Sequence, residues 1–154
     1  PPDGVRGVAG LHRANRYMTV PDYLARAAAE LCVAVQIETQ SALANLPAIA
    51  AVPGIDTIFI GPADLAASMG MLGDVGHAAV QDKLRQGAQM CRQAGKPCGI
   101  IGGAPDLVGR YVDYGYDWIA IGSDMSFMVG RAQEWLGRVR GRAPAAAPGP
   151  QGGY

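Results

Sequence analysis

Several features that would point to common functions are missing from this sequence. No apolar run approaches the roughly 20 residues that span a bilayer, so no transmembrane segment is predicted. Lys plus Arg and Asp plus Glu number 13 each, so no basic surplus indicates a nucleic-acid partner. The chain begins PPDGVR, which is not a signal peptide and has no initiator Met, and this predicts a processed or incomplete chain. We therefore expect neither a membrane nor a nucleic acid as partner.

Motifs for several kinds of chemistry are missing as well. Cys32, Cys91 and Cys98 lack metal-ligand spacing and lie in or near apolar runs, which predicts reduced structural thiols in a cytoplasmic protein. Neither GxGxxG nor GxxxxGK[ST] is present, so the usual nucleotide-binding loops are excluded. Neither lysine, Lys83 or Lys96, ends a predicted strand, so a Schiff-base mechanism has no candidate.

Short apolar runs instead alternate with helix-period segments, punctuated by 22 glycines and 11 prolines. The predicted strands cover residues 32–38, 57–61, 97–101 and 117–121, and the predicted helices cover residues 21–31, 39–51, 77–94, 105–114 and 125–139. This alternation is typical of a parallel α/β sheet covered on both sides. We expect one unit over residues 1–140 and a disordered tail rich in Pro, Gly and Ala over residues 141–154.

Four strand–helix units fit two architectures. One is a small open sheet, and the other is half of a (β/α)8 barrel, which usually needs about 250 residues. Because the nucleotide fingerprint of an open sheet and a normal chain start are both missing, the sequence favours a TIM-barrel type, with about four βα units forming half of the barrel.

Acidic side chains follow two of the predicted strands. Glu38 ends the first strand, and Asp64 lies just beyond the second. Neighbouring strands lie about 4.8 Å apart, so the two carboxylates can converge, and a divalent cation such as Mg²⁺ or Mn²⁺ would relieve their repulsion. The alternative is that each acid only caps the helix that follows it. Both interpretations stay open at this stage.

Other residues at the strand ends suggest ligand contacts. Gln36 shares a strand face with Glu38 and is either a substrate contact or a satisfied core amide. Residues 61–65 (GPADL) bring backbone N–H groups to a helix start, where a carboxylate can bind. The pairs Gly102–Gly103 and Gly122–Ser123 stand where phosphate-binding barrels hold phosphate, although tight turns also need small residues.

The two histidines are weak candidates for a base. His77 is expected to start a helix, and His12 precedes the first predicted helix among polar neighbours, which favours a surface position.

Two segments resemble the paired motif of the HpcH/HpaI aldolase family. They are residues 35–39 (VQIET) and residues 60–65 (IGPADL), and the 26-residue step from Glu38 to Asp64 agrees as well. Further agreement lies in residues 6–8, 13–17, 21–24 and 120–124, so that the resemblance covers about residues 4–139.

The resemblance implies a class II aldolase on a (β/α) barrel, a carbon–carbon lyase that forms or cleaves 2-keto-acid aldols through a metal-stabilised pyruvate enolate. Glu38 and Asp64 would be ligands of a divalent metal, Mg²⁺, Mn²⁺ or Co²⁺. Gln36 would contact the pyruvate, and Ala63 with Asp64 would offer backbone N–H groups to its carboxylate. The resemblance further implies an aldehyde as the second substrate and a role in the catabolism of aromatic compounds, and the intact protein is expected to be a homo-oligomer, a trimer or hexamer.

The sequence also departs from the family. The catalytic His base and the keto-binding Arg of the family lie in its first strands, in the half that this sequence lacks, and neither His12 nor Arg13 matches those motifs. The catalytic residues are therefore unknown, and the chain resembles the C-terminal half of the barrel. The alternatives are a citrate-lyase β-type or malyl-CoA-type lyase, and a non-catalytic half-barrel that binds a partner or itself.

Overall fold

The computed structural model describes residues 4–141. The chain divides after Cys32 into two units, Pro1–Cys32 and Val33–Tyr154. The predicted disordered tail lies, apart from Gly141, outside the described residues. Among residues 4–141, no helix combines the length and the apolar character that crossing a membrane requires.

The first unit holds a short 3-10 helix η1 (Arg13–Asn15) and the helix α1 (Tyr23–Glu30). The buried side chain of Asn15 organises the loop around η1. Its Oδ1 accepts from the backbone N–H of Met18 at 3.1 Å, and its Nδ2 donates to the carbonyl of Gly10. These bonds support a turn in which Arg16, Tyr17 and Met18 all have positive φ, a conformation that non-glycine residues rarely adopt.

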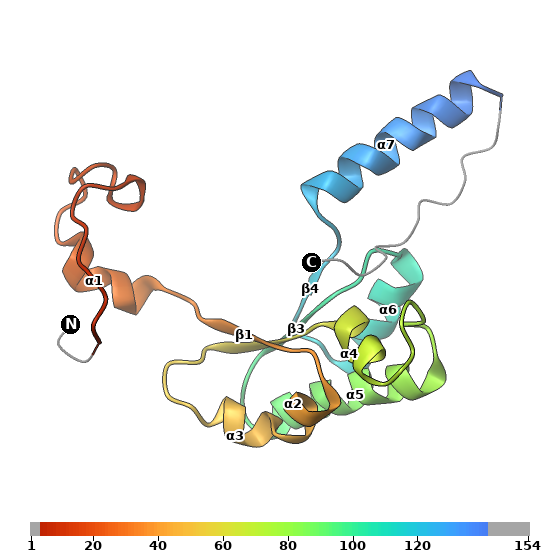
Figure 1. Ribbon diagram of the computed structural model, residues 1–154, viewed down its shortest axis with the longest axis horizontal. Helices are drawn as coiled ribbons and strands as arrows, with labels where there is room; N and C mark the ends of the chain where they lie inside the picture. Colours follow the sequence, from red (N-terminus) through yellow and green to blue (C-terminus); the bar gives the residue numbers. More distant parts are fainter. Residues whose placement is uncertain (1–3, 142–154) are drawn as a thin grey trace. The chain divides into compact units, whose positions relative to one another are not determined.

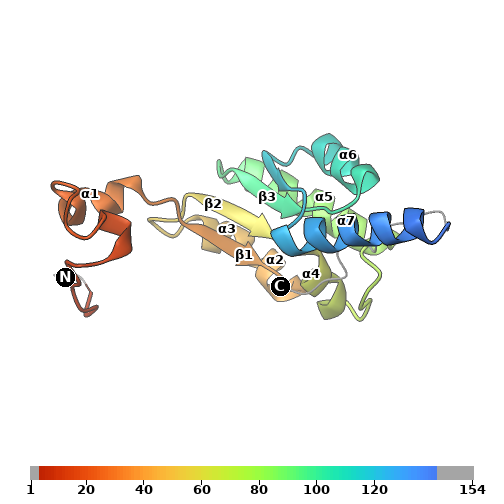
Figure 2. The same ribbon diagram turned by 90° about the horizontal axis from the view of Figure 1, so that it is seen from above.

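The second unit is built on a four-stranded parallel sheet. Its strands are β1 (Ala34–Ile37), β2 (Thr57–Ile60), β3 (Cys98–Ile101) and β4 (Trp118–Ala120), and their spatial order follows the chain. The register pairs Gln36 with Phe59 on β2, and Phe59 with Gly99 on β3. Figure 2 shows β1 and β2 side by side. All four predicted strands are present, each shorter than predicted by one to three residues.

Six helices follow the strands in this unit: α2 (Gln40–Ala44), α3 (Leu46–Ala50), α4 (Pro62–Ser68), α5 (Ala78–Gln93), α6 (Pro105–Tyr114) and α7 (Asp124–Val139). The helix predicted for residues 39–51 is two helices that meet at Asn45. Pro47 explains the break, because its ring has no N–H and would clash with the carbonyl of Leu43 in a continuous helix.

The helices α2 to α6 lie on one face of the sheet (Figure 1). The long helix α5 packs against β2 and β3 and is flanked by α3, α4 and α6. The core between them contains Ile58, Ile60, Leu84 and Ile100, each 0% exposed. Within residues 33–141 these helices thus cover one face of the sheet, whereas the sequence predicted helices on both sides.

Strand order explains why only one face is covered. Right-handed crossovers between consecutive neighbouring strands place every helix on the same face, which is how a (β/α) barrel is wound, whereas a doubly wound open sheet reverses its order. The second unit is thus an α/β sheet of the TIM-barrel type, and its described residues contain four strands, half the number in a closed (β/α)8 barrel.

The open face of the sheet is packed at one end by Trp118. Its indole lies across Gly99, where a Cβ would stand 2.2 Å from the ring, and its centroid is 5.1 Å from that of Phe59. The indole Nε1 donates to Thr57 Oγ1 at 3.0 Å, and Thr57 Oγ1 donates to the carbonyl of Pro97 at 2.8 Å. Glycine at position 99 makes this arrangement possible.

The three cysteines are free, but they do not share one environment. Cys91 and Cys98 are buried, as expected for structural thiols, whereas Cys32 is exposed. A hydrogen bond between the buried thiols lowers the pKa of Cys91, and the same bond together with burial raises the pKa of Cys98. Burial also raises the pKa of Tyr116, whose hydroxyl donates to the carbonyl of Leu84 at 2.8 Å.

Candidate functional site at the strand ends

The end of β1 sorts its side chains as the alternation predicts. Ile37 is 1% exposed in the core, whereas Gln36 is exposed and Glu38, directly after the strand, is half-buried. Side chains two residues apart share a face of a strand, so Gln36 and Glu38 both belong to the open face. The interpretation of Gln36 as a satisfied core amide is wrong, because the side chain is exposed.

Gly61, the residue after β2, lies directly against both of these side chains. A Cβ built on Gly61 would stand 3.0 Å from Gln36 Nε2, 3.0 Å from Glu38 Cγ and 3.1 Å from Glu38 Oε1. The backbone N–H of Gly61 donates to the carbonyl of Ile37 at 3.0 Å, which continues the pairing between β1 and β2. The polar ends of Gln36 and Glu38 therefore both lie beside Gly61, at the end of β2.

The helix α4 begins at this point and contains Asp64 in its first turn. Pro62 occupies the first helical position, and the first backbone bond of the helix is donated by Leu65 to the carbonyl of Gly61 at 3.0 Å. The N–H groups of Ala63 and Asp64 precede that bond and so have no acceptor within the helix. The predicted cluster of N–H groups at a helix start is present, with Ala63 half-buried and Asp64 exposed.

Neither of the two acids is the cap of the helix that follows it. Thr39 is the cap of α2, and its hydroxyl accepts from the backbone N–H of Ala42 at 3.0 Å. Glu38 is therefore not the cap, and the capping interpretation is wrong for this residue. Asp64 does not cap α4 either, because Gly61 occupies the cap position, although a carboxylate in the first turn is favourable to the helix dipole.

A second link holds the two strand ends together. The backbone N–H of Gln40 donates to Ser68 Oγ at 3.2 Å, and Gln40 Nε2 donates to the carbonyl of Ser68 at 3.1 Å. These bonds join the start of α2, two residues after Glu38, to the last residue of α4. The segment that carries Glu38 is thus tied to the helix that carries Asp64.

The donor set at this edge fits a hard divalent cation. Mg²⁺ and Mn²⁺ bind through one or two carboxylates and complete their coordination with water and substrate oxygens. No group of three or more His, Cys, Asp and Glu side chains suited to a metal occurs within residues 4–141, which disfavours a zinc site built from protein ligands alone. The Glu38 carboxylate and the Gln36 amide beside Gly61, with Asp64 in the first turn of α4, suit the first kind of ion.

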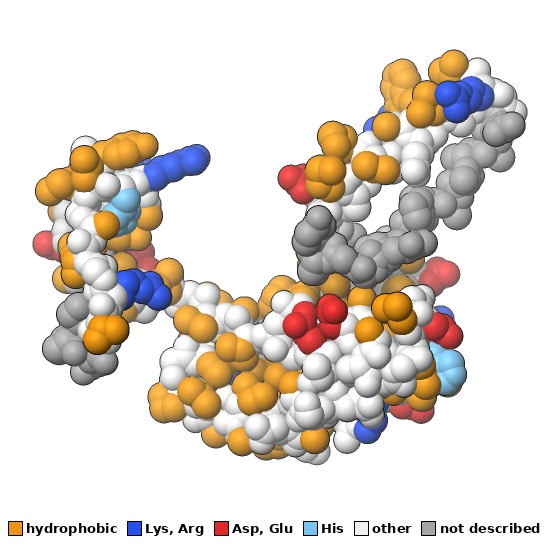
Figure 3. All heavy atoms as spheres, viewed as in Figure 1, with side chains coloured by type: hydrophobic (Ala, Val, Ile, Leu, Met, Phe, Trp, Pro, Cys, Tyr) orange, Lys and Arg blue, Asp and Glu red, His pale blue; other side chains and the backbone are white. Residues whose placement is uncertain are grey.

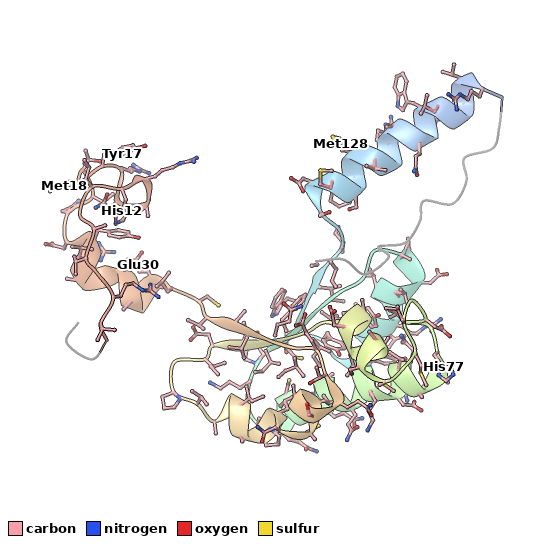
Figure 4. All side chains as sticks on the ribbon, viewed as in Figure 1. His12, Tyr17, Met18, Glu30, His77 and Met128 are labelled. Carbon is pink, nitrogen blue, oxygen red and sulfur yellow. The ribbon has the colours of Figure 1, made fainter. Side chains whose placement is uncertain are left out.

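The histidines and lysines make other contacts, each within its own unit. His77 caps α5, with Nδ1 accepting from the N–H of Ala79 at 3.2 Å, and Figure 4 shows it at the helix start. In the first unit His12 is half-buried, and its ring centroid lies 5.5 Å from that of Tyr23. Lys83 bonds to Gln86 on α5, and Lys96 donates to the carbonyl of Ile55.

Packing and capping account for two of the small residues that were considered for phosphate. A Cβ on Gly102 would stand 2.9 Å from the buried ring of Tyr111. Ser123 is the cap of α7, where its Oγ accepts from the N–H of Ser126 at 3.2 Å. Neither residue needs a phosphate to explain its presence.

Comparison with known proteins places the chain in a family. Residues 1–130 match the HpcH/HpaI aldolase/citrate lyase family, and the chain belongs to it. It is 45% identical over 147 residues to a 2-dehydro-3,6-dideoxy-6-sulfogluconate aldolase of Pseudomonas putida. The matched region covers 95% of this chain and 58% of that protein. The chain is 43% identical to a 4-hydroxy-2-oxo-heptane-1,7-dioate aldolase of Shigella sonnei, covering 97% and 57%.

Solved structures agree on the fold. An HpcH/HpaI aldolase/citrate lyase family protein from Burkholderia cenocepacia superposes with a TM-score of 0.80 at 40% identity, covering 90% of this chain and 54% of that one. An HpcH/HpaI aldolase from Desulfitobacterium hafniense gives a TM-score of 0.75 at 22% identity, which supports the fold alone. The chain spans rather more than half the length of the relatives it matches.

Two parts of this site escaped prediction from the sequence. In the sequence Gly61 resembles an ordinary turn glycine. Its contact with Gln36 and Glu38 could not be predicted because it depends on the register between β1 and β2. The link between Gln40 and Ser68 joins residues 28 positions apart, and no local pattern announces it. Knowing the register would have indicated the first, because position 61 then stands opposite position 38.

Proposed function

We propose that the protein is a metal-dependent carbon–carbon lyase that forms or cleaves 2-keto-acid aldols, and that this chain carries its metal- and pyruvate-binding side. The observation that carries the proposal is that Gln36 and Glu38 both lie beside Gly61, at the edge where α4 presents Asp64. The sites of (β/α) barrels form at this end of the strands. The relatives' names, which include pyruvate, 4-hydroxy-2-oxo-acid and sugar-acid aldolases, support the same class of reaction.

Each residue of the edge has a role that suits its chemistry. Glu38 and Asp64 would hold a divalent cation, Mg²⁺, Mn²⁺ or Co²⁺. A cation held by these residues would supply positive charge to stabilise the negative charge that develops on the keto oxygen as the methyl proton leaves. Gln36 would donate its amide N–H to a substrate oxygen. Ala63 and Asp64 would donate their backbone N–H groups to the carboxylate of the keto acid.

The exposed hydrophobic side chains of α7 bear on how the protein assembles. We propose a homo-oligomer, because α7 has no buried residue and presents hydrophobic side chains along its length (Figure 3). These residues are Met125, Phe127, Met128, Val129, Trp135, Leu136 and Val139. Light scattering on the chain at increasing concentration tests the proposed homo-oligomer, and a monomer at all concentrations would contradict it.

We also propose a cytoplasmic location, which the free cysteines support.

A citrate-lyase β-type or malyl-CoA-type lyase is the alternative within the family. The names of the 42–46% identical relatives favour the aldolase branch. The alternative outside enzymology is a half-barrel that binds metal without turnover. It is favoured by one observation within the second unit, which is that its single histidine, His77, serves as the cap of α5.

Exchange of the pyruvate methyl protons in D₂O, followed by NMR, tests the proposal directly. If this chain also supplies a base, exchange should require Mn²⁺ or Mg²⁺, stop with EDTA and be abolished by Asp64→Asn. The exposed Asp82→Asn, whose carboxylate pairs with Arg85 on the surface of α5, is the matched control and should leave exchange unchanged. Metal binding by a folded chain without any exchange would favour the non-catalytic half-barrel.

A further inference from the structure

Gly61 does not need to be glycine for the sake of its backbone. Its φ of −88° and ψ of 99° lie in the extended region, which any residue adopts. Glycines elsewhere in the unit do have positive φ, for example Gly95 at 67° and Gly115 at 87°. The choice of glycine at position 61 therefore calls for another physical reason.

Space supplies that reason. The three atoms nearest to a Cβ at position 61, at 3.0 to 3.1 Å, all belong to Gln36 and Glu38. Contacts this short are tighter than ordinary carbon contacts of about 3.5–4.0 Å, so one partner must shift. One of the contacts is to Glu38 Cγ, close to the main chain, so a shift there carries the whole carboxylate with it.

The backbone of Gly61 has little freedom to yield instead. Its N–H donates to the carbonyl of Ile37 at 3.0 Å, and its carbonyl accepts from the N–H of Leu65 at 3.0 Å. Gly61 is itself buried between β1 and α4. A larger residue at position 61 would therefore displace the side chains of Gln36 and Glu38 and leave its own backbone in place.

We infer that Gly61 is a positioning residue, and that the empty volume beside its Cα sets where Gln36 and Glu38 stand relative to Asp64. The inference rests on the proposed function for its purpose, and on the three contact distances for its geometry. It makes the metal affinity of the chain depend on a residue that offers no ligand atom.

Titration of Mn²⁺, with the free ion followed by electron paramagnetic resonance, tests the inference on the full chain. Gly61→Ala should weaken Mn²⁺ binding about tenfold, as is typical when the support of a metal ligand is altered. Gly109→Ala on α6 is the matched control, because a Cβ there meets nothing within 4 Å, and its affinity should equal that of the parent. Circular dichroism should show the same helix content in all three chains.

A second measurement needs no metal. In NMR spectra of the metal-free chain, Gly61→Ala should shift the side-chain amide resonances of Gln36, and Gly109→Ala should leave them in place. Unshifted Gln36 resonances in Gly61→Ala would overturn the inference whatever the metal does.

The two proposals fail in different ways. If the parent chain binds Mn²⁺, Glu38→Gln abolishes binding and Gly61→Ala retains full affinity, the inference is overturned and the metal site stands. If the parent chain does not bind Mn²⁺ but the Gln36 resonances shift in Gly61→Ala, the steric role stands and the proposed metal site is wrong.

Discussion

The two faces of the β-sheet in the second unit differ in how far their side chains are exposed. On the helix-covered face, Ile58, Ile60 and Ile100 are completely buried. On the open face, Gln36 is exposed and Trp118 retains 39% of its accessible surface. Consecutive residues such as Gln36 and Ile37 thus meet opposite environments.

This difference separates stability from function along each strand. Buried aliphatic side chains on the covered face supply the apolar burial that holds the unit together. Polar side chains at the end of the open face contribute little to that burial and are free to meet a ligand. Substitutions on the covered face should therefore change the free energy of unfolding, and substitutions at the strand ends should change binding.

The largest effect on stability is expected on the covered face. Leu84→Ala empties a fully buried position on α5 and should lower the free energy of unfolding by about 2–5 kcal/mol. Leu72→Ala, at a position that is 85% exposed, is the control and should change it by less than about 0.5 kcal/mol. Urea denaturation followed by circular dichroism measures both. Equal effects would mean that the covered face is not the stabilising core.

A smaller effect is expected where the open face is packed. Gly99→Ala places a Cβ 2.2 Å from the indole of Trp118, and overpacking of this kind costs about 1–3 kcal/mol. The indole should move toward water, so its fluorescence should shift to longer wavelength. Trp135→Phe leaves Trp118 as the single tryptophan for this measurement. An unshifted spectrum would contradict the packing of Trp118 over Gly99.

Removing one hydroxyl from the open face should cost less. Thr57→Val deletes the oxygen that accepts from Trp118 and donates to the carbonyl of Pro97. Loss of one such bond usually costs about 1 kcal/mol, and the partly exposed indole can turn to water instead. Thermal unfolding should show a small decrease, and a loss as large as that of Leu84→Ala would contradict the contrast between the faces.

The smallest effect on stability is expected at the strand ends. Glu38→Gln and Asp64→Asn remove charges that make no ion pair within residues 4–141. Each should change the free energy of unfolding by less than about 0.5 kcal/mol in metal-free buffer. A larger loss in either variant, measured by urea denaturation with EDTA present, would show that the acid serves the fold.

Local patterns predicted the helices and strands well where a proline or a glycine marks the end of the element. Residues 105–114 were predicted as a helix because a proline begins it and a glycine ends it, and α6 has those bounds, with Gly115 at a φ of 87°. The strands and the alternation of Gln36 and Ile37 followed from periodicity. The family resemblance extended the prediction to Glu38, Asp64 and the barrel fold, and the comparisons confirm the family and the fold.

Properties that depend on pairing between distant segments were not accessible in this way. Coverage of only one sheet face follows from strand order, and strand order is a relation among four segments. Thr39, and not Glu38, caps α2, a difference of one residue that periodicity does not resolve. The close approach of Gly61 to Gln36 and Glu38 requires the register of two strands.

Relaxation of water protons by Mn²⁺ tests the central claim most directly, because it reports both the binding of the ion and the arrival of a ligand at it. For the parent chain we predict enhanced relaxation on binding Mn²⁺ and a further change when pyruvate is added. Glu38→Gln and Asp64→Asn should each lose the enhancement, and the control Asp82→Asn should keep it. Enhancement that persists in both strand-end variants would show that the ion binds elsewhere and would contradict the account.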